Sequence, residues 1–308
     1  MEKLSFHLDP VPPFRLDLTA WLLRRRADNI IDRWDGKTYR RVLVVENEAV
    51  EVAVKQVSPA EAALLEVEVT GVKLPPGTRQ VVTLAMERAL GIGVDLSSFY
   101  ALAETDPQLG KLVLPFRGVK PTRYPSLFET LANAITCQQI TLSLGIRMLN
   151  KMAETYGPPF AGEGGPNFAF PRPADLAFLP PEGLRPLGLS RAKSRSLVGL
   201  ACAVVDHRLD LEALLGENDE TAIQILTGWP GIGRWTAEYF LLRGAGRLDS
   251  FPGDDVGGRN HLQRWLGMAE KLDYERVEDS LAAWKPYAGL IYLHLLLNGL
   301  AESGLLVV

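Results

Sequence analysis

A glycine-rich break between two helical segments constrains this chain more than any other feature. Residues 226–242 read LTGWPGIGRWTAEYFLL: one apolar segment ends at Leu226, a turn follows, and Arg234 begins the next segment. Gly231 and Gly233 can adopt positive φ and leave no side chain in the turn, which predicts two helices joined by a tight hairpin. Amides at a helix start suit an anion such as a DNA phosphate, although a turn that needs glycine only for packing gives the same pattern.

A second motif, FPGDDVGG at residues 251–258, brings two carboxylates to the start of another predicted helix. Aspartate is a favoured N-cap residue, and Asp254 fits that role. Asp255 is then one residue inside the positive end of the helix, which favours its ionised form. Because one aspartate is enough for capping, Asp255 is a candidate catalytic carboxylate. The alternative is that both residues serve only the helix end.

Composition excludes several classes of protein. Lys and Arg number 33 against 37 Asp and Glu, a net charge of −4, so the chain does not bind nucleic acid or membrane by overall charge. Two cysteines cannot form a four-thiolate metal site. The N-terminus lacks a signal-peptide core, and the apolar stretch 288–297 is too short to span a bilayer. We therefore expect a soluble, cytoplasmic protein that does not contact membranes.

The first third of the chain alternates apolar and polar residues. The alternation predicts antiparallel strands over residues 39–45, 50–57 and 64–70, with helices over 21–34 and 76–91. From about residue 120 the pattern is helical: Ser126 and Glu129 form a capping box in which the carboxylate returns to the Ser126 amide, and Thr141 and Ser190 begin further helices. Residues 157–187, rich in Pro and Gly and including Gly164, predict a loop with short helical pieces. The fold class is mainly α with an N-terminal α+β domain.

Taken together, the hairpin and the FPGDD motif about twenty residues later resemble the helix-hairpin-helix DNA glycosylases, most closely the 3-methyladenine DNA glycosylase II (AlkA-like) branch. LANAITCQQI at 131–140, GLSRAK at 188–193 and WKPY at 284–287 agree with it. The similarity covers residues 116–301. It implies an α+β sheet domain over 1–115 and, over 116–308, two helical subdomains with the active-site cleft between them.

The resemblance also implies roles for individual residues. Asp255 corresponds to the catalytic carboxylate, and Trp235 and Tyr239 to the base pocket. The implied DNA-binding residues are Gln139, Trp229, Gly231, Ile232, Gly233 and Arg234. The carbonyls of Thr227, Trp229 and Ile232 correspond to a site for Na⁺ or K⁺, and no cofactor is required. The aromatic pair has core packing as its alternative. The turn before Gln139 carries Thr136-Cys137 where relatives often have glycine, and Ala288-Gly289 replaces a common Arg-Ser.

The implied function is a monofunctional glycosylase of base excision repair. It would act as a monomer on double-stranded DNA containing damaged bases, releasing alkylated purines of the 3-methyladenine and 7-methylguanine type. Bifunctional relatives have lysine where this chain has Trp235, so no AP-lyase activity is expected. Phosphate contacts would come from a local face drawn from Arg191, Lys193, Arg195, Arg234, Arg243, Arg247, Arg259 and Arg264. The alternatives are a glycosylase for oxidised or deaminated purines and a non-catalytic DNA-binding module.

Overall fold

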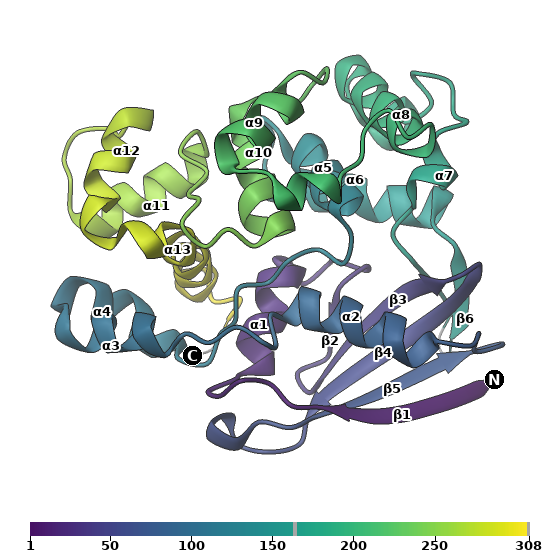
Figure 1. Cartoon of the computed structure of the whole chain (residues 1–308), viewed down its shortest axis with the longest axis horizontal. Helices are drawn as coiled ribbons and strands as arrows, with labels where there is room; N and C mark the ends of the chain where they lie inside the picture. The colour runs from purple at the N-terminus through teal and green to yellow at the C-terminus, as the bar shows by residue number, and fades with distance from the viewer. Residues whose placement is uncertain (163–164, 307–308) are drawn as a thin grey trace.

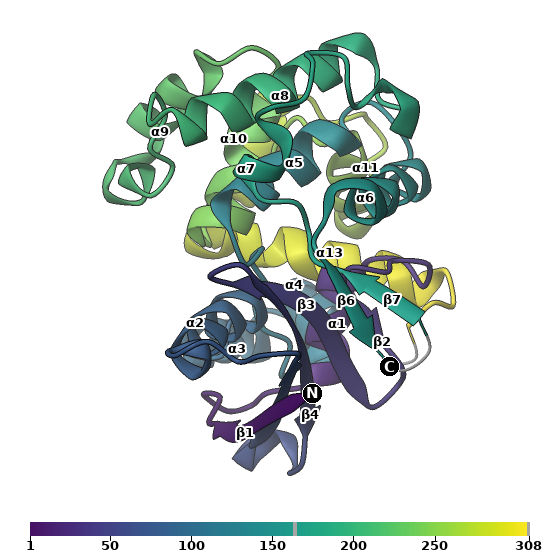
Figure 2. The same cartoon turned by 90° about the vertical axis from the view of Figure 1, so that its right-hand side faces the viewer.

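The computed structural model describes residues 1–162 and 165–306 (Figures 1 and 2). Its N-terminal part is a five-stranded antiparallel sheet in the order β1-β5-β4-β3-β2. The strands are β1 (Glu2–Leu8), β2 (Arg33–Trp34), β3 (Thr38–Val45), β4 (Glu48–Gln56) and β5 (Leu65–Gly71). Alternate valines of β4 and β5 pack under α1 (Leu16–Arg24) and α2 (Thr78–Leu90), so period-two alternation identified the three central strands correctly.

One expectation for this part was wrong, and one strand was missed. Residues 21–34 do not form one helix: α1 ends at Arg24 because Arg25 has φ 57°, and residues 33–34 belong to the edge strand β2. The strand β1 was not predicted, although Leu4, Phe6 and Leu8 alternate with the polar residues between them over Glu2–Leu8. It forms the other edge of the sheet and pairs with β5, so that Glu2 lies opposite Gly71 at one end and Leu8 lies opposite Leu65 at the other.

The rest of the chain is predominantly helical, and helices α5 to α12 lie above the sheet domain in both views (Figures 1 and 2). Its longer elements are α5 (Leu127–Cys137), α6 (Leu142–Tyr156), α8 (Arg191–Val205), α9 (Asp219–Thr227), α10 (Arg234–Phe240), α11 (Val256–Leu266), α12 (Tyr274–Leu281) and α13 (Ala288–Glu302). A π-helical turn, Leu241–Ala245, follows α10 directly. The fold class expected from sequence is thus confirmed.

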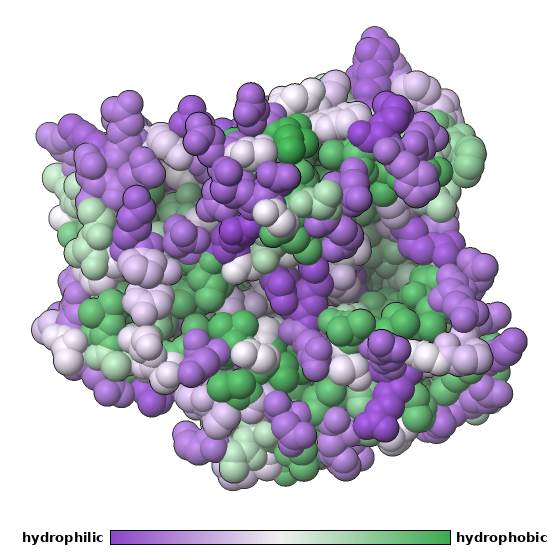
Figure 3. All heavy atoms as spheres, in the orientation of Figure 1, coloured by the Kyte–Doolittle hydropathy of each residue, from purple (hydrophilic) through white to green (hydrophobic). Residues whose placement is uncertain are grey.

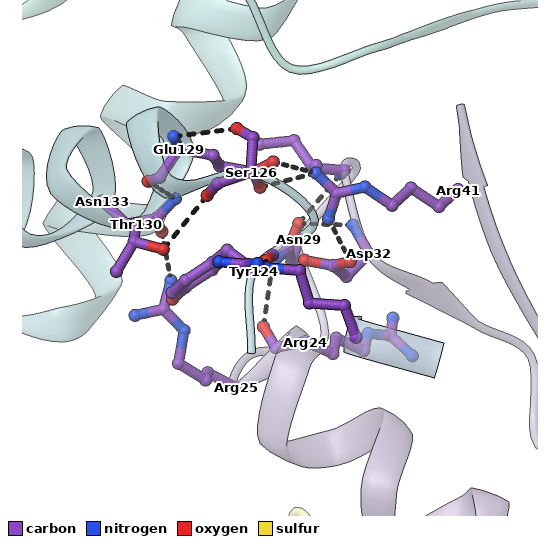
Figure 4. A network of polar contacts seen from close by, with 12 residues as sticks. Arg24, Arg25, Asn29, Asp32, Arg41, Tyr124, Ser126, Glu129, Thr130 and Asn133 are labelled. Carbon is purple, nitrogen blue, oxygen red and sulfur yellow. Dashed lines mark hydrogen bonds and ion pairs between the residues drawn. The ribbon is translucent and has the colours of Figure 1, made fainter. Parts of the chain in front are cut away.

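The start of α5 differs from the expected capping box. Ser126 Oγ accepts the Glu129 amide at 3.1 Å, as predicted. The Glu129 carboxylate, however, does not return to the helix end. It binds the guanidinium of Arg41 on β3, and Arg41 also pairs with Asp32 (Figure 4). A buried ion-pair network therefore joins the sheet to α5.

The Pro- and Gly-rich segment contains the expected short helical pieces, but part of it is extended, which was not predicted. Strands β6 (Pro159–Gly162) and β7 (Gly165–Phe168) form a hairpin, and β6 lies against β4 of the sheet. Gly164 lies outside the described residues. Short helical pieces do occur further on, at α7 (Pro173–Leu176) and at Arg185–Leu187.

Helices α3 (Ser97–Thr105) and α4 (Pro107–Val113) share a core with the C-terminal helices α11, α12 and α13. Residues 97–113 thus pack with elements from the far end of the chain, although they precede the boundary expected at 115. Helix α13 also packs on α1, which places the last helix between the sheet domain and the helical region (Figure 1).

Within the part of the chain that the structure describes, no helix is both long and apolar enough to cross a membrane. Polar and apolar side chains are intermixed over the face drawn in Figure 3. With a net charge of −4, any affinity for an anionic partner has to come from a local arrangement of donors.

Candidate functional site

A cleft of about 870 Å³ separates two groups of helices. Its lining comes from three segments: the α5–α6 turn (137–141), the hairpin with the start of α10 (231–236), and the start of α11 (254–257). Six of the residues predicted from sequence line it, namely Gln139, Gly231, Ile232, Gly233, Trp235 and Asp255. Segments distant in the sequence therefore meet at one surface.

Asp255 is the N-cap of α11. Its Oδ1 accepts the amides of Gly257 at 2.8 Å and Gly258 at 3.1 Å. Its Oδ2 accepts the hydroxyl of Tyr292 on α13 at 2.5 Å. Three donors from two elements fix the carboxylate at the mouth of the cleft, and glycines at 257 and 258 let the chain pass close to it; a Cβ on Gly257 would lie 3.2 Å from Oδ1.

The prediction that Asp254 caps the helix and leaves Asp255 free was wrong. Asp255, not Asp254, caps α11, and Asp254 is exposed at the edge of the cleft. The chain enters the helix one residue later than expected, because the Asp255 backbone is still extended at φ −69° and ψ 107°. The capping role and the candidate catalytic role thus fall on one carboxylate.

A second cavity, of about 450 Å³, continues from the cleft into the protein. Asp255, Trp235 and Cys137 line both spaces, whereas Tyr239 lines only the inner one. The Trp235 and Tyr239 rings lie one turn apart on α10 with centroids 5.5 Å apart, and the Tyr239 hydroxyl is 3.1 Å from that of Tyr124. These aromatics form a pocket wall beside the carboxylate.

The hairpin glycines differ from each other. Gly231 has φ +84°, and a Cβ there would lie 2.0 Å from Ser196 Oγ, so this position requires glycine. Gly233 has φ −99° and faces open space, because a Cβ at this position would meet no atom within 4 Å. The expectation of positive φ is thus confirmed for Gly231 and wrong for Gly233, whose lack of a side chain serves no contact within the protein.

The α5–α6 turn is tied to the hairpin by Gln138. Its Nε2 donates to the Gly231 carbonyl at 2.9 Å and to Thr236 Oγ1 at 2.8 Å. The neighbouring Gln139 is exposed in the cleft and has φ +53°, a strained conformation for a residue other than glycine. The two hydrogen bonds of Gln138 therefore hold the backbone of the turn, and the Gln139 side chain extends from it into the cleft.

The other predicted DNA-binding residues lie nearby in different settings. Arg234 is exposed, with its guanidinium 4.4 Å from the Tyr274 ring centroid. Ile232 is 5% exposed and its side chain packs in the core, which leaves its backbone for contacts. Trp229 packs against the same core beneath Arg208. The indole of Trp229 is thus mainly structural.

Several of the basic residues considered for the DNA face are engaged elsewhere. Arg243 is buried and donates to the Leu22 carbonyl. Lys193 donates to the carbonyls of Thr136 at 3.0 Å and Gln138 at 2.5 Å. Lys193 therefore stabilises the α5–α6 turn, and burial lowers the pKa of its ammonium group. Arg191 and Arg195 both pair with Glu182.

The inner-pocket residues that sequence reasoning missed include Tyr292, His261 and Arg25. Burial, followed by the neighbouring Asp255, raises the pKa of Tyr292 well above its ordinary value. A tyrosine within an apolar helix was a usable signal, because a buried hydroxyl requires a partner. Burial and the Arg264 guanidinium lower the pKa of His261. Arg25 comes from the N-terminal domain, where no motif marked it.

Comparisons with known proteins agree with this geometry. The family of HhH-GPD superfamily base excision DNA repair proteins matches residues 132–286, about half of the chain. DNA-3-methyladenine glycosylase of Bacillus subtilis is 30% identical over 63% of this chain and 64% of its own length. DNA-3-methyladenine glycosylase 2 of Escherichia coli is 30% identical over 61% of this chain and 63% of its own length. The chain thus matches just under two thirds of these relatives.

Solved structures extend the likeness to the whole chain. The 3-methyladenine DNA-glycosylase of Archaeoglobus fulgidus superposes with a TM-score of 0.82 and 26% identity, covering 98% of this chain and 100% of that one. An 8-oxoguanine glycosylase/lyase of Clostridium acetobutylicum with bound DNA, at 17% identity and a TM-score of 0.73, shares the fold. The chain belongs to the HhH-GPD superfamily of base excision DNA repair proteins.

Proposed function

We propose that this protein is a monofunctional DNA glycosylase that removes alkylated purines from double-stranded DNA and leaves an abasic site. One observation carries the proposal: a carboxylate held by three donors stands where an open cleft meets an aromatic-lined pocket. The names of the two bacterial relatives and of the archaeal structure, all 3-methyladenine glycosylases, support the same substrate class.

The cleft suits DNA and the inner pocket suits one base. A base inside a duplex is out of reach, so its nucleotide has to rotate into the pocket, at a cost of a few kcal/mol for unstacking. The hairpin amides would hold a phosphate, and Gln139 would fill the gap left in the stack. A sodium or potassium ion on the carbonyls of Thr227, Trp229 and Ile232 would brace the hairpin. The Trp229 carbonyl accepts the Ile232 amide at 3.1 Å and keeps a second lone pair for such an ion.

In the pocket, Trp235 and Tyr239 would stack on the base while Asp255 faces the sugar. Breaking the glycosidic bond gives the sugar oxocarbenium character, which a nearby carboxylate stabilises. Asp255 would also orient the water that attacks the anomeric carbon. An alkylated purine with a positive charge leaves without an added proton, and electron-rich rings attract it by about 0.5–2 kcal/mol. We propose that these steps need no cofactor and that the protein acts as a monomer.

Strand cleavage would require an amine that attacks the sugar to form a Schiff base. Trp235 occupies the position of the lysine in bifunctional relatives, and an indole cannot form an imine. The nearby Lys193 is bound to two backbone carbonyls and does not line either cavity. We therefore propose that water is the nucleophile and that the strand stays intact.

The test is a panel of duplexes, each with one damaged base, in which released base and strand breaks are measured separately. We expect release of alkylated purine, strand breaks only after alkali, and no adduct on borohydride treatment. Asp255→Asn should lower the rate of release by about a hundredfold to a thousandfold, since oriented electrostatic groups contribute factors of this size. Asparagine is an equally good N-cap, so folding should persist. Asp254→Asn, which alters the exposed neighbour, should retain most of the turnover; the reverse pattern would contradict the assignment.

A further inference from the structure

The turn that carries Gln139 is held by a lysine from another helix. Lys193 lies in the first turn of α8, and its ammonium group donates to the carbonyls of Thr136 at 3.0 Å and Gln138 at 2.5 Å. Both carbonyls lie at the C-terminal end of α5, and no backbone amide of the described residues donates to either of them. The helix dipole also favours a cation at this end of a helix. Lys193 thus supplies the hydrogen bonds that the end of α5 lacks.

The contact with the Gln138 carbonyl acts directly on the conformation of Gln139. This carbonyl belongs to the peptide plane that precedes Gln139, and φ of Gln139 is the rotation that relates its own Cα substituents to that plane. The angle is +53°, in the left-handed region, which residues other than glycine keep only where the surrounding structure imposes it. Fixing the carbonyl therefore fixes one side of the strained bond.

Helix α8 supports the hairpin as well as the turn. It packs against α5, and Ser196, three residues after Lys193, lies so close to Gly231 that a Cβ on the glycine would meet its Oγ at 2.0 Å. The Gly231 carbonyl in turn accepts Nε2 of Gln138 at 2.9 Å. The turn, the hairpin and α8 are thus joined by direct contacts, which fix the place of Gln139 relative to the hairpin.

A side chain that fills the gap left by a rotated nucleotide is most effective when it is already ordered, because ordering a group on binding costs affinity. Gln139 is exposed in the cleft, whereas Lys193 lines neither cavity. We propose that Lys193 is a positioning residue for base flipping, which keeps Gln139 in place to fill that gap before DNA binds. This inference rests on the proposed glycosylase function and adds to it a residue that acts through Gln139.

Two duplexes measure the role of Gln139 apart from the chemical step. One contains a tetrahydrofuran abasic analogue, which has no base to release, and the other is undamaged. The ratio of their dissociation constants gives the preference for the abasic duplex. Lys193→Met should lower this preference by about tenfold, to near that of Gln139→Ala, because the turn then has to be ordered on binding. The single-turnover rate of 7-methylguanine release should fall by a similar factor.

A double-mutant cycle shows whether Lys193 acts through Gln139. In the Gln139→Ala background, Lys193→Met should change the preference by less than about twofold, because the side chain that it positions is already absent. Lys193→Arg keeps a cation with several donors near the carbonyls, so it should stay within about threefold of wild type. Lys193→Met should also leave the salt dependence of binding unchanged, since a lysine bound to carbonyls does not neutralise a phosphate.

Lys120→Met is the matched control. Lys120 is buried, donates to the Val94 carbonyl at 2.7 Å and lines neither cavity, and burial lowers the pKa of its ammonium group to about 8. Its replacement should change the preference by less than about twofold, because it lies apart from the turn. Thermal unfolding checks every variant. If Lys193→Met does not fold, Lys193→Gln, which keeps an amide donor for one carbonyl, replaces it in the cycle.

The outcomes separate the two proposals. If wild-type protein releases no damaged base, the glycosylase function is wrong, and the binding ratios still test by themselves whether Lys193 acts through Gln139. The positioning proposal is overturned if Lys193→Met or Gln139→Ala leaves the preference unchanged, or if their effects multiply. It is also overturned if Lys193→Met lowers the salt slope by about one, which would indicate a direct phosphate contact. A loss that Lys120→Met reproduces would overturn it too, because reduced stability would then explain the effect.

Discussion

At the scale of single residues, the hydrogen bond from Tyr292 to Asp255 connects two helices through the candidate catalytic carboxylate. It joins α13 to the start of α11 and fixes the carboxylate oxygen that the two glycine amides leave free. Tyr292 lies edge-on to Phe251 of the FPGDD motif, with ring centroids 5.2 Å apart. The hydroxyl thus orients the reactive group from a helix that lies far from it in sequence.

We expect Tyr292→Phe to lower the single-turnover rate of base release by about tenfold while the protein stays folded. The ring keeps its packing, and one hydrogen bond to a charged group is worth about 1.5–3 kcal/mol. Affinity for a tetrahydrofuran duplex should stay within about twofold, because the phosphate contacts are untouched. An unchanged rate would mean that the two glycine amides alone orient Asp255.

The residues found from sequence share one property: they belong to local motifs. Asp255, Trp235 and Gly231 lie within motifs whose spacing encodes turn and helix geometry, so the sequence identified them. Arg25 and Tyr292 enter the pocket only through packing between α1, α5, α11 and α13, and no local pattern encodes that packing. The cap was assigned to Asp254 because propensity alone cannot decide between two adjacent aspartates.

At the scale of elements, the hairpin offers a clean comparison between its two glycines. Gly231→Ala places a methyl group in contact with Ser196, and its backbone has a positive φ that alanine adopts only with strain. The substitution should therefore lower the free energy of unfolding by more than about 1 kcal/mol. Gly233→Ala has an ordinary φ and open space, so stability should hold.

Gly233→Ala should nevertheless weaken binding to duplexes of any sequence by about tenfold, because its methyl would stand between the hairpin amides and a phosphate. Fluorescence anisotropy with two unrelated duplexes measures this, with thermal unfolding as the check on folding. Full affinity in the Gly233→Ala variant would show that DNA does not approach the hairpin backbone closely.

Helix α10 holds the FPGDD loop through Glu238. One oxygen of its carboxylate accepts the Tyr274 hydroxyl at 2.7 Å and the other accepts the Gly253 amide at 3.1 Å. Burial, with a contribution from Asp254, raises the pKa of Glu238 to about 7. Protonated glutamate preserves both contacts, because the acid can donate to Tyr274 while its carbonyl oxygen still accepts from Gly253.

Because the folded-state pKa of Glu238 lies above its ordinary value of 4.5, ionisation favours the unfolded chain. The stability associated with this group is fully present below about pH 4.5 and is lost as the pH rises to about 7. Glu238→Gln keeps the same hydrogen bonds without a proton to lose, so its unfolding free energy should fall less steeply over this range. Urea unfolding at pH 5, 6, 7 and 8 measures the slopes, and parallel curves for the two proteins would contradict the prediction.

At the scale of the whole molecule, the sheet domain and the helical region are joined by buried charge as well as by apolar packing. Arg41 on β3 contacts Asp32 at 2.7 Å and Glu129 on α5 at 2.5 Å, and the Tyr39 hydroxyl donates to Asp32 at 2.7 Å. Helix α5 leads directly into the turn that carries Gln138 and Gln139. Sequence patterns located the sheet and the helices but not this junction, because each charge lies in a different local motif.

Arg41→Met should lower the free energy of unfolding at pH 7.5 by about 3–5 kcal/mol, because it leaves two carboxylates buried without a cation. Burial already raises the pKa of Glu129, so ionising it favours the unfolded chain. Without Arg41, ionised Glu129 destabilises the folded state further. The loss of unfolding free energy in the variant should therefore become smaller as the pH falls to 5, where Glu129 takes up a proton. Glu129→Gln combined with Arg41→Met should recover part of the loss.

Arg33→Met, which breaks the partly exposed pair with Glu51, is the control and should cost less than about 1 kcal/mol. Urea unfolding at both pH values measures all four proteins, and equal costs for the Arg41 and Arg33 variants would show that the two regions are held together by apolar packing alone.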